Sequence, residues 1–243
     1  MQRTVQPEIL DGLPACNLDA MASRRDLVKI NYLMGNYRWM RRQIRRTRLS
    51  QQDRLLEIGA GDGLLAKKLM RTLGRAGSTH SFDSPVPGAP RHSQTEPEAR
   101  YPGGYHALDQ CGPPRDWPNQ ANWHSANLLQ FSGYGDYTHL LANLILHHFR
   151  ASELLRLGQR LEEGGIRCII ACEPCRRPVH KLQLRAGKWI GFNYVTLNDG
   201  CVSVDAGFRA EELPELLGLD PVDWWWSIDE TWMGAYRMRA EKR

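Results

Sequence analysis

The first 50 residues have a helical pattern of hydrophobic positions. Between residues 19 and 48, apolar side chains recur at spacings of three and four: Leu27, Ile30, Leu33, Met34, Tyr37, Met40 and Ile44. This spacing puts them on one face of a helix. The pattern predicts one or two helices packing ahead of the main domain, with Gly35 as a possible break.

A strand, a glycine turn and a helix are predicted between residues 55 and 74. Residues 55–58 (LLEI) form a short apolar run that glycines end, which is typical of a buried strand. Leu65, Leu69 and Leu73 then share one helical face, and the helix is expected to stop at Gly74. This order is the opening of a βαβ unit.

Residues 76–104 interrupt the alternation. The segment is rich in proline, glycine and serine and has no apolar periodicity, so we expect an exposed, flexible insertion. Beyond it, residues 105–109 predict a second strand that ends on Asp109. The segment 81–83, which ends on Asp83, is a weaker competitor for the same place.

The alternation then continues to the end of the chain. The predicted elements are strand 121–124, strand 137–142, helix 153–161 with Ser152 as its cap, strand 166–172, a basic helix 178–189, a loop 193–207, a short helix 210–217, and strands 222–228 and 231–238. This order predicts an α/β fold with a doubly wound, mostly parallel sheet of seven strands. We divide the chain into a helical extension (1–50) and the main domain (51–243), with a further insertion at 176–210.

Composition narrows the class of protein. The 243 residues are 42% hydrophobic, enough to bury a core, and no apolar run approaches the roughly 18 to 20 residues of a membrane span. Residues 1–20 contain acids and no continuous apolar region, so we expect no secretory signal and a cytoplasmic protein. Much of the net charge of +5 lies in an arginine cluster at residues 41–48. We favour a solvated helix end over a nucleic-acid site there.

Six cysteines are present, including the pair Cys172 and Cys175. A single C-x-x-C without a second pair lacks the ligands of a structural zinc site, so we expect packing roles and no metal.

The ends of five predicted strands supply the candidate site. Parallel strands bind ligands at their carboxyl ends, near the switch in strand order. These ends are residues 57–63, Asp109, residues 127–128, Asn143 and Glu173. Their convergence at one edge is the strongest functional indication in the sequence.

The first of these ends is a G-x-G-x-G turn, made by Gly59, Gly61 and Gly63. Glycines permit positive φ and close approach of a ligand to the backbone. A dinucleotide fold expects G-x-G-x-x-G, with its last glycine where this chain has Leu64. The carboxylate of Asp62 would also repel a pyrophosphate. A cationic ligand is therefore favoured, although NAD stays an alternative here.

Asp109 is the candidate ribose-binding acid. It lies 46 residues after Gly63 (109 − 63), beyond the usual distance of about 20, and the predicted insertion accounts for the surplus. Asp83 has the usual spacing but lies in the proline-rich segment, so we favour Asp109 and keep Asp83 as the alternative.

These residues resemble a known family. Residues 55–63 (LLEIGAGDG) look like the first motif of class I S-adenosylmethionine (SAM)-dependent methyltransferases. Residues 143–149 (NLILHHF) resemble the segment after the fourth strand in ubiquinone/menaquinone-type small-molecule methyltransferases, and the likeness covers residues 55–173. The resemblance implies a Rossmann-like methyltransferase fold with SAM as the cofactor.

The resemblance also implies residue roles. Those around the methionine part of SAM would be Glu57, Gly59, Ala60, Gly61, Gly63 and Asn143. Asp109 would hold the ribose, and Asn127 and Leu128 would flank adenine. The family often has Asp where this chain has Asn127, but an amide carbonyl can accept the same hydrogen bond.

The acceptor side is less determined. His147 and His148 lie just beyond the fourth strand, so they are the first candidates for catalysis, with packing or capping as the alternative. Methyl transfer chiefly needs alignment, and a base only where the acceptor loses a proton. The next candidates are Glu173, Arg176 and His180, and residues 196–208, with Asp199, Asp205 and Phe208, are either a lid or an ordinary hairpin. Trp224 and Trp226 should share a strand face, where core packing is favoured over a substrate platform.

The sequence therefore predicts a methyltransferase that modifies an O or C atom of a small molecule. RNA or protein methylation is the second hypothesis. It is weakened because the end of the fourth strand, residues 143–146, lacks the Asn/Asp-Pro-Pro-aromatic motif of base amino methylation. A SAM-fold protein with a binding role and no catalysis is the third.

Overall fold

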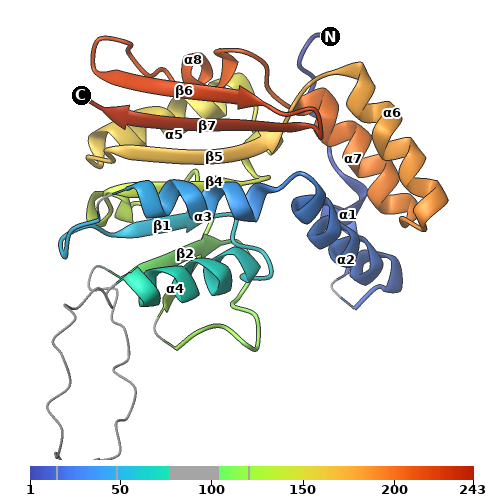
Figure 1. The fold of residues 1–243 in the computed structure, drawn as a ribbon, viewed down its shortest axis with the longest axis horizontal. Coiled ribbons are helices and arrows are strands. Elements are labelled where there is room, and N and C mark those ends of the chain that lie inside the picture. Colours follow the sequence, from blue (N-terminus) through green and yellow to red (C-terminus); the bar gives the residue numbers. More distant parts are fainter. Residues whose placement is uncertain (15, 48, 77–103, 120) are drawn as a thin grey trace, which may run out of the picture.

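The computed structural model describes residues 1–14, 16–47, 49–119 and 121–243, except for 77–103. Its centre is a seven-stranded sheet in the order β3-β2-β1-β4-β5-β7-β6 (Figure 1). The strands are β1 (Leu55–Ile58), β2 (Tyr105–Asp109), β3 (Ala121–Ser125), β4 (His139–Asn143), β5 (Cys168–Pro174), β6 (Trp224–Glu230) and β7 (Ala235–Lys242). The first five are parallel, and β7 pairs antiparallel with both β5 and β6. The predicted fold class is confirmed.

Helices cover both faces of this sheet. α3 (Asn36–Arg46) and α4 (Leu64–Ala76) lie on one face, and α5 (Ala151–Glu163) and α8 (Glu212–Leu216) lie on the other (Figure 1). The remaining helices are α1 (Ile9–Gly12), α2 (Leu18–Leu33), α6 (Pro178–Ala186) and α7 (Tyr194–Ala206), with 3₁₀ turns η1 (Gly133–Asp136), η2 (Leu146–His148) and η3 (Gly187–Ile190).

Alternation along the strands builds a hydrophobic core on each face. Leu55 points to the face of α3 and α4, where it joins Met40 and Leu69. Its neighbour Leu56 points to the opposite face and packs with Leu157 of α5. Because successive strand side chains face opposite ways, two cores form from one sheet.

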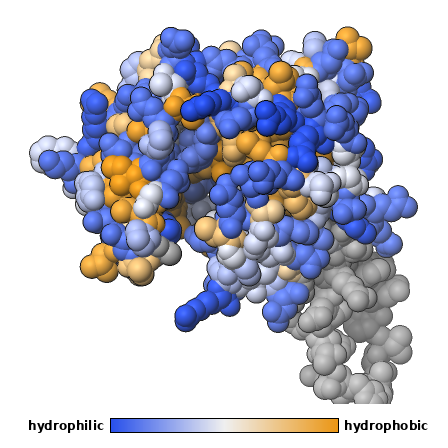
Figure 2. All heavy atoms as spheres, turned by 180° about the vertical axis from the view of Figure 1, so that it is seen from behind, coloured by the Kyte–Doolittle hydropathy of each residue, from blue (hydrophilic) through white to orange (hydrophobic). Residues whose placement is uncertain are grey.

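The carboxyl ends of β1 to β5 meet at one edge, where α1, α2, α6 and α7 gather as a helical end (Figure 1). Figure 2 shows the molecule from behind, with hydrophobic atoms at this end, on the left of the view. Four of the exposed apolar side chains there belong to α6 and η3: Val179, Leu182, Trp189 and Ile190. Among the described residues, no helix combines the length and apolar content that crossing a membrane requires.

The N-terminal prediction holds for one helix and fails in part for the other. Gly35 does separate α2 from α3, with φ of 70°, and Tyr37, Met40 and Ile44 of α3 are buried. In α2, by contrast, Leu33 is 52% exposed. The side chains that α2 buries are Ala20, Ser23, Asp26 and Asn31. Ser23 and Asp26 accept hydrogen bonds from Thr196 of α7, so hydrophobic periodicity could not identify this face.

Residues 193–207 were predicted to form a loop. This prediction is wrong, because residues 194–206 form α7. The segment 196–208, expected to be a lid or a hairpin, is therefore mostly helix. The helix begins after Asn193, and the side chain of Asn193 accepts a hydrogen bond from the backbone N–H of Val195 at 2.8 Å. The helix is rich in β-branched residues and contains Gly200, which lowers helix propensity and hid it in the sequence.

Ser152 does not cap α5; the helix begins after Arg150, whose backbone N–H donates to the carboxylate of Glu153 at 2.7 Å. The flexible insertion proposed at 76–104 and the competing strand at 81–83 lie almost wholly outside the described residues.

Candidate active site

The glycine turn after β1 has the conformation that its sequence predicted. Gly59, Gly61 and Gly63 have φ values of 66°, 52° and 67°, a region that side chains disfavour. At Gly59 an added Cβ would lie 2.5 Å from the side chain of Ile145, whereas at Gly61 it would meet nothing within 4 Å. The backbone at Gly61 is therefore open to a ligand, and Gly59 allows the turn after β4 to pack closely.

Asp109 is joined directly to this turn. Its Oδ2 accepts from the backbone N–H of Gly61 at 2.9 Å, and its Oδ1 accepts from that of Cys111 at 2.9 Å. The second strand end and the glycine turn thus meet, although they are 48 residues apart. Asp83, the alternative acid, lies outside the described residues.

Glu57 is buried and paired inside the protein. Its Oε2 accepts a hydrogen bond from the hydroxyl of Tyr105, which is also buried. Burial raises the pKa of Glu57 to about 8, the nearby charges of Asp62 and Asp109 add to the rise, and the Tyr105 hydrogen bond opposes it. The side chain of Glu57 therefore links β1 to β2 through Tyr105, a partner that the sequence did not indicate.

Asn127 and Leu128 follow β3. Asn127 Oδ1 accepts from the backbone N–H of Leu129 at 2.8 Å, which makes a local turn, and Leu128 is buried in the core under α5. A carbonyl oxygen has a second lone pair, so this turn leaves Asn127 Oδ1 able to accept once more.

Asn143, at the end of β4, belongs to a set of three asparagines. Oδ1 of Asn31 accepts from Nδ2 of Asn143 at 3.0 Å and from Nδ2 of Asn36 at 3.2 Å. Asn31 Nδ2 in turn donates to the carbonyl of Leu27 at 3.1 Å, which fixes the direction of the amide. The buried Oδ1 atoms of Asn143 and Asn36 have no partner among the described residues.

Such orphaned acceptors are rare in folded proteins, because burying one without a partner costs about 1–3 kcal/mol. Two of them, one at the end of β4 and one at the start of α3, fit a ligand that brings N–H donors, as the ammonium of a methionine would. Asn31 and Asn36 were missed in the sequence. The available signal was a polar residue four positions after Leu27 on an otherwise amphipathic helix.

The turn after β4 is strained and held from β5. Leu144 has φ of 56°, unusual for a residue with a side chain. Glu173 Oε1 accepts from the backbone N–H groups of Ile145 at 3.1 Å and Leu146 at 2.9 Å. Glu173, predicted as a possible catalytic residue, is thus a buried anchor for the turn that presents the two histidines.

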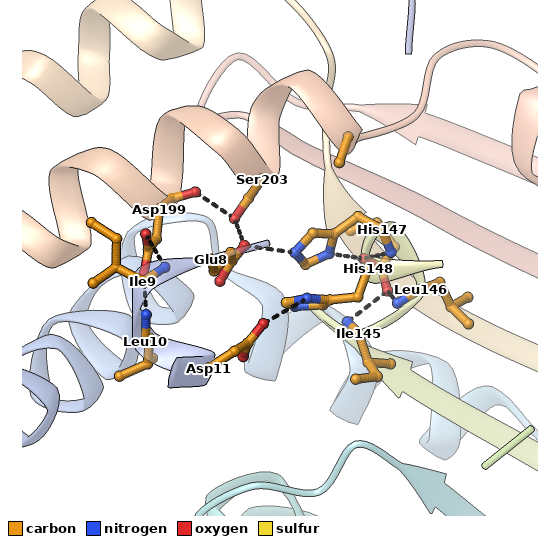
Figure 3. A network of polar contacts seen from close by, with 12 residues as sticks. Glu8, Ile9, Leu10, Asp11, Ile145, Leu146, His147, His148, Asp199 and Ser203 are labelled. Carbon is orange, nitrogen blue, oxygen red and sulfur yellow. Dashed lines mark hydrogen bonds and ion pairs between the residues drawn. The ribbon is translucent and has the colours of Figure 1, made fainter. Parts of the chain in front are cut away.

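His147 lies between two carboxylates, and Figure 3 shows it facing that of Glu8. Its Nδ1 is 2.7 Å from Oε2 of Glu173, and its Nε2 is 3.5 Å from Oε1 of Glu8. Burial alone would lower the pKa of His147, but the hydrogen bonds and charges of these acids outweigh it and raise the pKa to about 9. His147 is therefore not a free base in this arrangement.

His148 is the more accessible histidine. Its side chain is 26% exposed, and its Nδ1 lies 3.7 Å from Oδ2 of Asp11. Burial and the positive charge of His147 lower the pKa of His148, which favours its neutral ring.

The N-terminal segment that supplies Glu8 and Asp11 is tied to α7 (Figure 3). The carboxylate of Asp199 accepts from the backbone N–H groups of Ile9 at 2.9 Å and Leu10 at 2.8 Å. The hydroxyl of Ser203 donates to Glu8 Oε1 at 2.5 Å. Glu8 had no signal in the sequence, because its segment has neither periodicity nor a motif.

The remaining candidates have structural partners. Arg176 is buried and pairs with Glu212, and His180 is buried with its Nδ1 2.8 Å from Gln183 Oε1. Cys172 and Cys175 are buried free thiols, and burial raises the pKa of Cys175 to about 12. Trp224 is buried in the core, as predicted.

Comparisons with solved structures bear on the fold. The plantazolicin methyltransferase BpumL, in complex with a triazolic desmethylPZN analog and SAH, superimposes with a TM-score of 0.61 at 10% identity, over 92% of this chain and 89% of that one. BamL, another plantazolicin methyltransferase in complex with the same kind of analog and SAH, gives 0.62 at 8% identity, over 96% and 92%.

A third neighbour, the S-adenosylmethionine-dependent methyltransferase SibL in its apo form, gives a TM-score of 0.60 at 14% identity, over 98% of this chain and 63% of that one. This chain therefore spans less than two thirds of SibL. No protein-family model matches the sequence, and no curated protein matches it. The chain thus has the Rossmann-like fold of class I SAM-dependent methyltransferases.

Proposed function

We propose that this protein is a SAM-dependent methyltransferase that methylates an O or C atom of a small-molecule acceptor. The observation that supports it most is the meeting of three strand ends. Asp109 bonds to Gly61 in the glycine turn, and at the same sheet edge Asn143 has a buried oxygen with no partner among the residues that the structure describes. The solved neighbours BpumL and BamL, which share this fold, were crystallised with SAH.

The residues at these strand ends would bind the cofactor. The glycine turn, formed by Gly59, Ala60, Gly61 and Gly63 above Glu57, would hold the methionine part, with Asn143 beside it. Asp109 would accept from the ribose hydroxyls, and Asn127 and Leu128 would flank adenine. Asn36, through its buried Oδ1, is a further acceptor for the methionine ammonium.

The acceptor would lie beside the turn that carries His147 and His148. SAM would supply an electrophilic methyl group, and displacement on that carbon chiefly requires the acceptor to be held in line. Glu173 fixes the turn, and the partly exposed ring of His148 can contact the acceptor. The NLILHHF resemblance and the desmethylPZN analogs bound by two neighbours support a small acceptor.

Incubation with methyl-labelled SAM and a fractionated cell extract tests this function. We expect label in one small-molecule fraction with the wild type and none with Asp109→Ala. Label only in RNA or protein fractions would replace the small-molecule acceptor, and SAM binding without any labelled product would favour a binding role.

A further inference from the structure

Three ligand-bearing side chains from two distant segments meet at the acceptor side of the site. Glu8, His147 and His148 each place one ligand atom so that all three atoms lie within 4.8 Å of one another. Asp11 stands at the rim, and its carboxylate faces His148 (Figure 3).

The contacts from the two histidines to the carboxylates of Glu8 and Asp11 are long for hydrogen bonds. The separations of 3.5 Å between His147 and Glu8, and 3.7 Å between His148 and Asp11, exceed the 2.7–3.2 Å of a good N–H···O bond. Two ligands about 2.1 Å from a tetrahedral metal ion lie about 3.4 Å apart. The two separations are therefore close to the edge of a tetrahedral coordination shell.

The partners behind these residues also fit such a shell. Metal-bound histidine usually donates its second ring N–H to a carboxylate, which orients the ring. Glu173 is such a carboxylate, because its Oε2 lies 2.7 Å from Nδ1 of His147. The other ring nitrogen, Nε2, faces Glu8. Ser203 orients the carboxylate of Glu8, and Asp199 holds the backbone that bears it.

We propose that Glu8, His147 and His148 form a binding site for one divalent transition-metal ion, with Asp11 able to complete the shell. Two imidazoles and one carboxylate suit zinc, iron or cobalt rather than calcium or magnesium, which prefer oxygen ligands. Three protein ligands leave a coordination position open. This differs from our sequence-based expectation of no metal, because Glu8 is 139 residues from His147 (147 − 8) and no spacing motif joins them.

The role of the ion rests on the proposed function, whereas its binding does not. An ion here would hold an acceptor oxygen at its open position and make an attached hydroxyl more acidic. His147 and His148 would then act on the acceptor by binding the metal ion and not by removing a proton.

Titration of the full-length, chelator-treated protein with Co²⁺ tests the site, with calorimetry and visible absorbance as readouts. We expect one equivalent to bind, with the absorbance bands of a nitrogen and oxygen shell. His148→Ala and Glu8→Gln should abolish stoichiometric binding, and Ser203→Ala should raise Kd about 10–100-fold through loss of orientation. His124→Ala, at a histidine on β3, is the matched control and should bind as the wild type does.

SAH binding is measured for every variant. A variant that still binds SAH is folded, so its loss of Co²⁺ binding reports on the metal site and not on misfolding or on the proposed function. No Co²⁺ binding, or binding that persists in both His148→Ala and Glu8→Gln, would show that the cluster is only a network of ion pairs. Bands of thiolate ligation would assign the ion to cysteines and equally overturn the proposal. Stoichiometric Co²⁺ binding without SAH binding would leave the site standing and refute the methyltransferase.

Discussion

Nδ2 of Asn143 donates a hydrogen bond of 3.0 Å to Oδ1 of Asn31, so the end of β4 is tied to a helix 112 residues earlier in the chain. The same oxygen accepts from Asn36. Asn31 thereby orients two buried amides whose own oxygens have no hydrogen-bond partner in the described part of the chain. The N-terminal helices are thus part of the candidate cofactor site, and their loss would alter it.

Asn31→Ala should weaken SAH binding about fivefold, because the two amides lose the acceptor that orients them and one buried hydrogen bond is worth about 1 kcal/mol. Calorimetry with SAH measures the change. Asn122→Ala, at an exposed asparagine early in β3, is the control and should leave Kd unchanged. If Asn31→Ala and the wild type bound SAH with equal affinity, the three asparagines would have no part in cofactor binding.

Substitution of two glycines in the same turn should give different results. Gly59→Ala should destabilise the protein and abolish SAH binding, because its Cβ would lie 2.5 Å from Ile145. Gly61→Ala has space around the new methyl group and should cost only about 1–2 kcal/mol for its positive φ. Urea unfolding measures both changes. Ile145→Ala should partly rescue Gly59→Ala, and an absence of rescue would argue against the steric account.

The buried carboxyl of Glu57 predicts a pH dependence of stability. Its pKa rises from 4.5 to about 8 on folding, so the folded state keeps a proton that the unfolded state releases. The contribution of Glu57 to the free energy of unfolding should therefore be full below pH 4.5 and fall as pH rises toward 8. Glu57→Gln should remove this fall, and urea unfolding of both proteins at several pH values checks it. A difference between them that stays constant with pH would contradict the burial effect.

The ribose assignment yields a paired test. Asp109→Ala should raise the Kd for SAH by at least about tenfold, because it removes a charged acceptor and the bond to the backbone of Gly61. Asp83→Ala should leave Kd as it is. A raised Kd in Asp83→Ala with an unchanged Kd in Asp109→Ala would show that Asp83 binds the ribose instead.

Strong local patterns allowed most of the fold to be predicted from the sequence. The strand before Gly59 and the helix break at Gly35 were located because a buried run and a glycine leave local signals. α7 was missed because its stability comes from contacts with α2 and α6 rather than from amphipathic periodicity.

The candidate site was only half visible for a similar reason. Asp109 and Asn143 stand at strand ends, where topology makes position predictable. Glu8 and Asn31 reach the site from the N-terminal segment, through contacts more than 100 residues apart along the chain. Such tertiary partners leave no spacing to recognise in a single sequence.

Equilibrium binding of SAM and SAH to the purified protein tests the central claim most directly. We predict one site per chain with Kd in the micromolar range and a raised Tm, both lost in Asp109→Ala. Neither heat nor thermal stabilisation with either compound, from a wild-type protein that unfolds cooperatively, would contradict the assignment of this fold to methyl transfer.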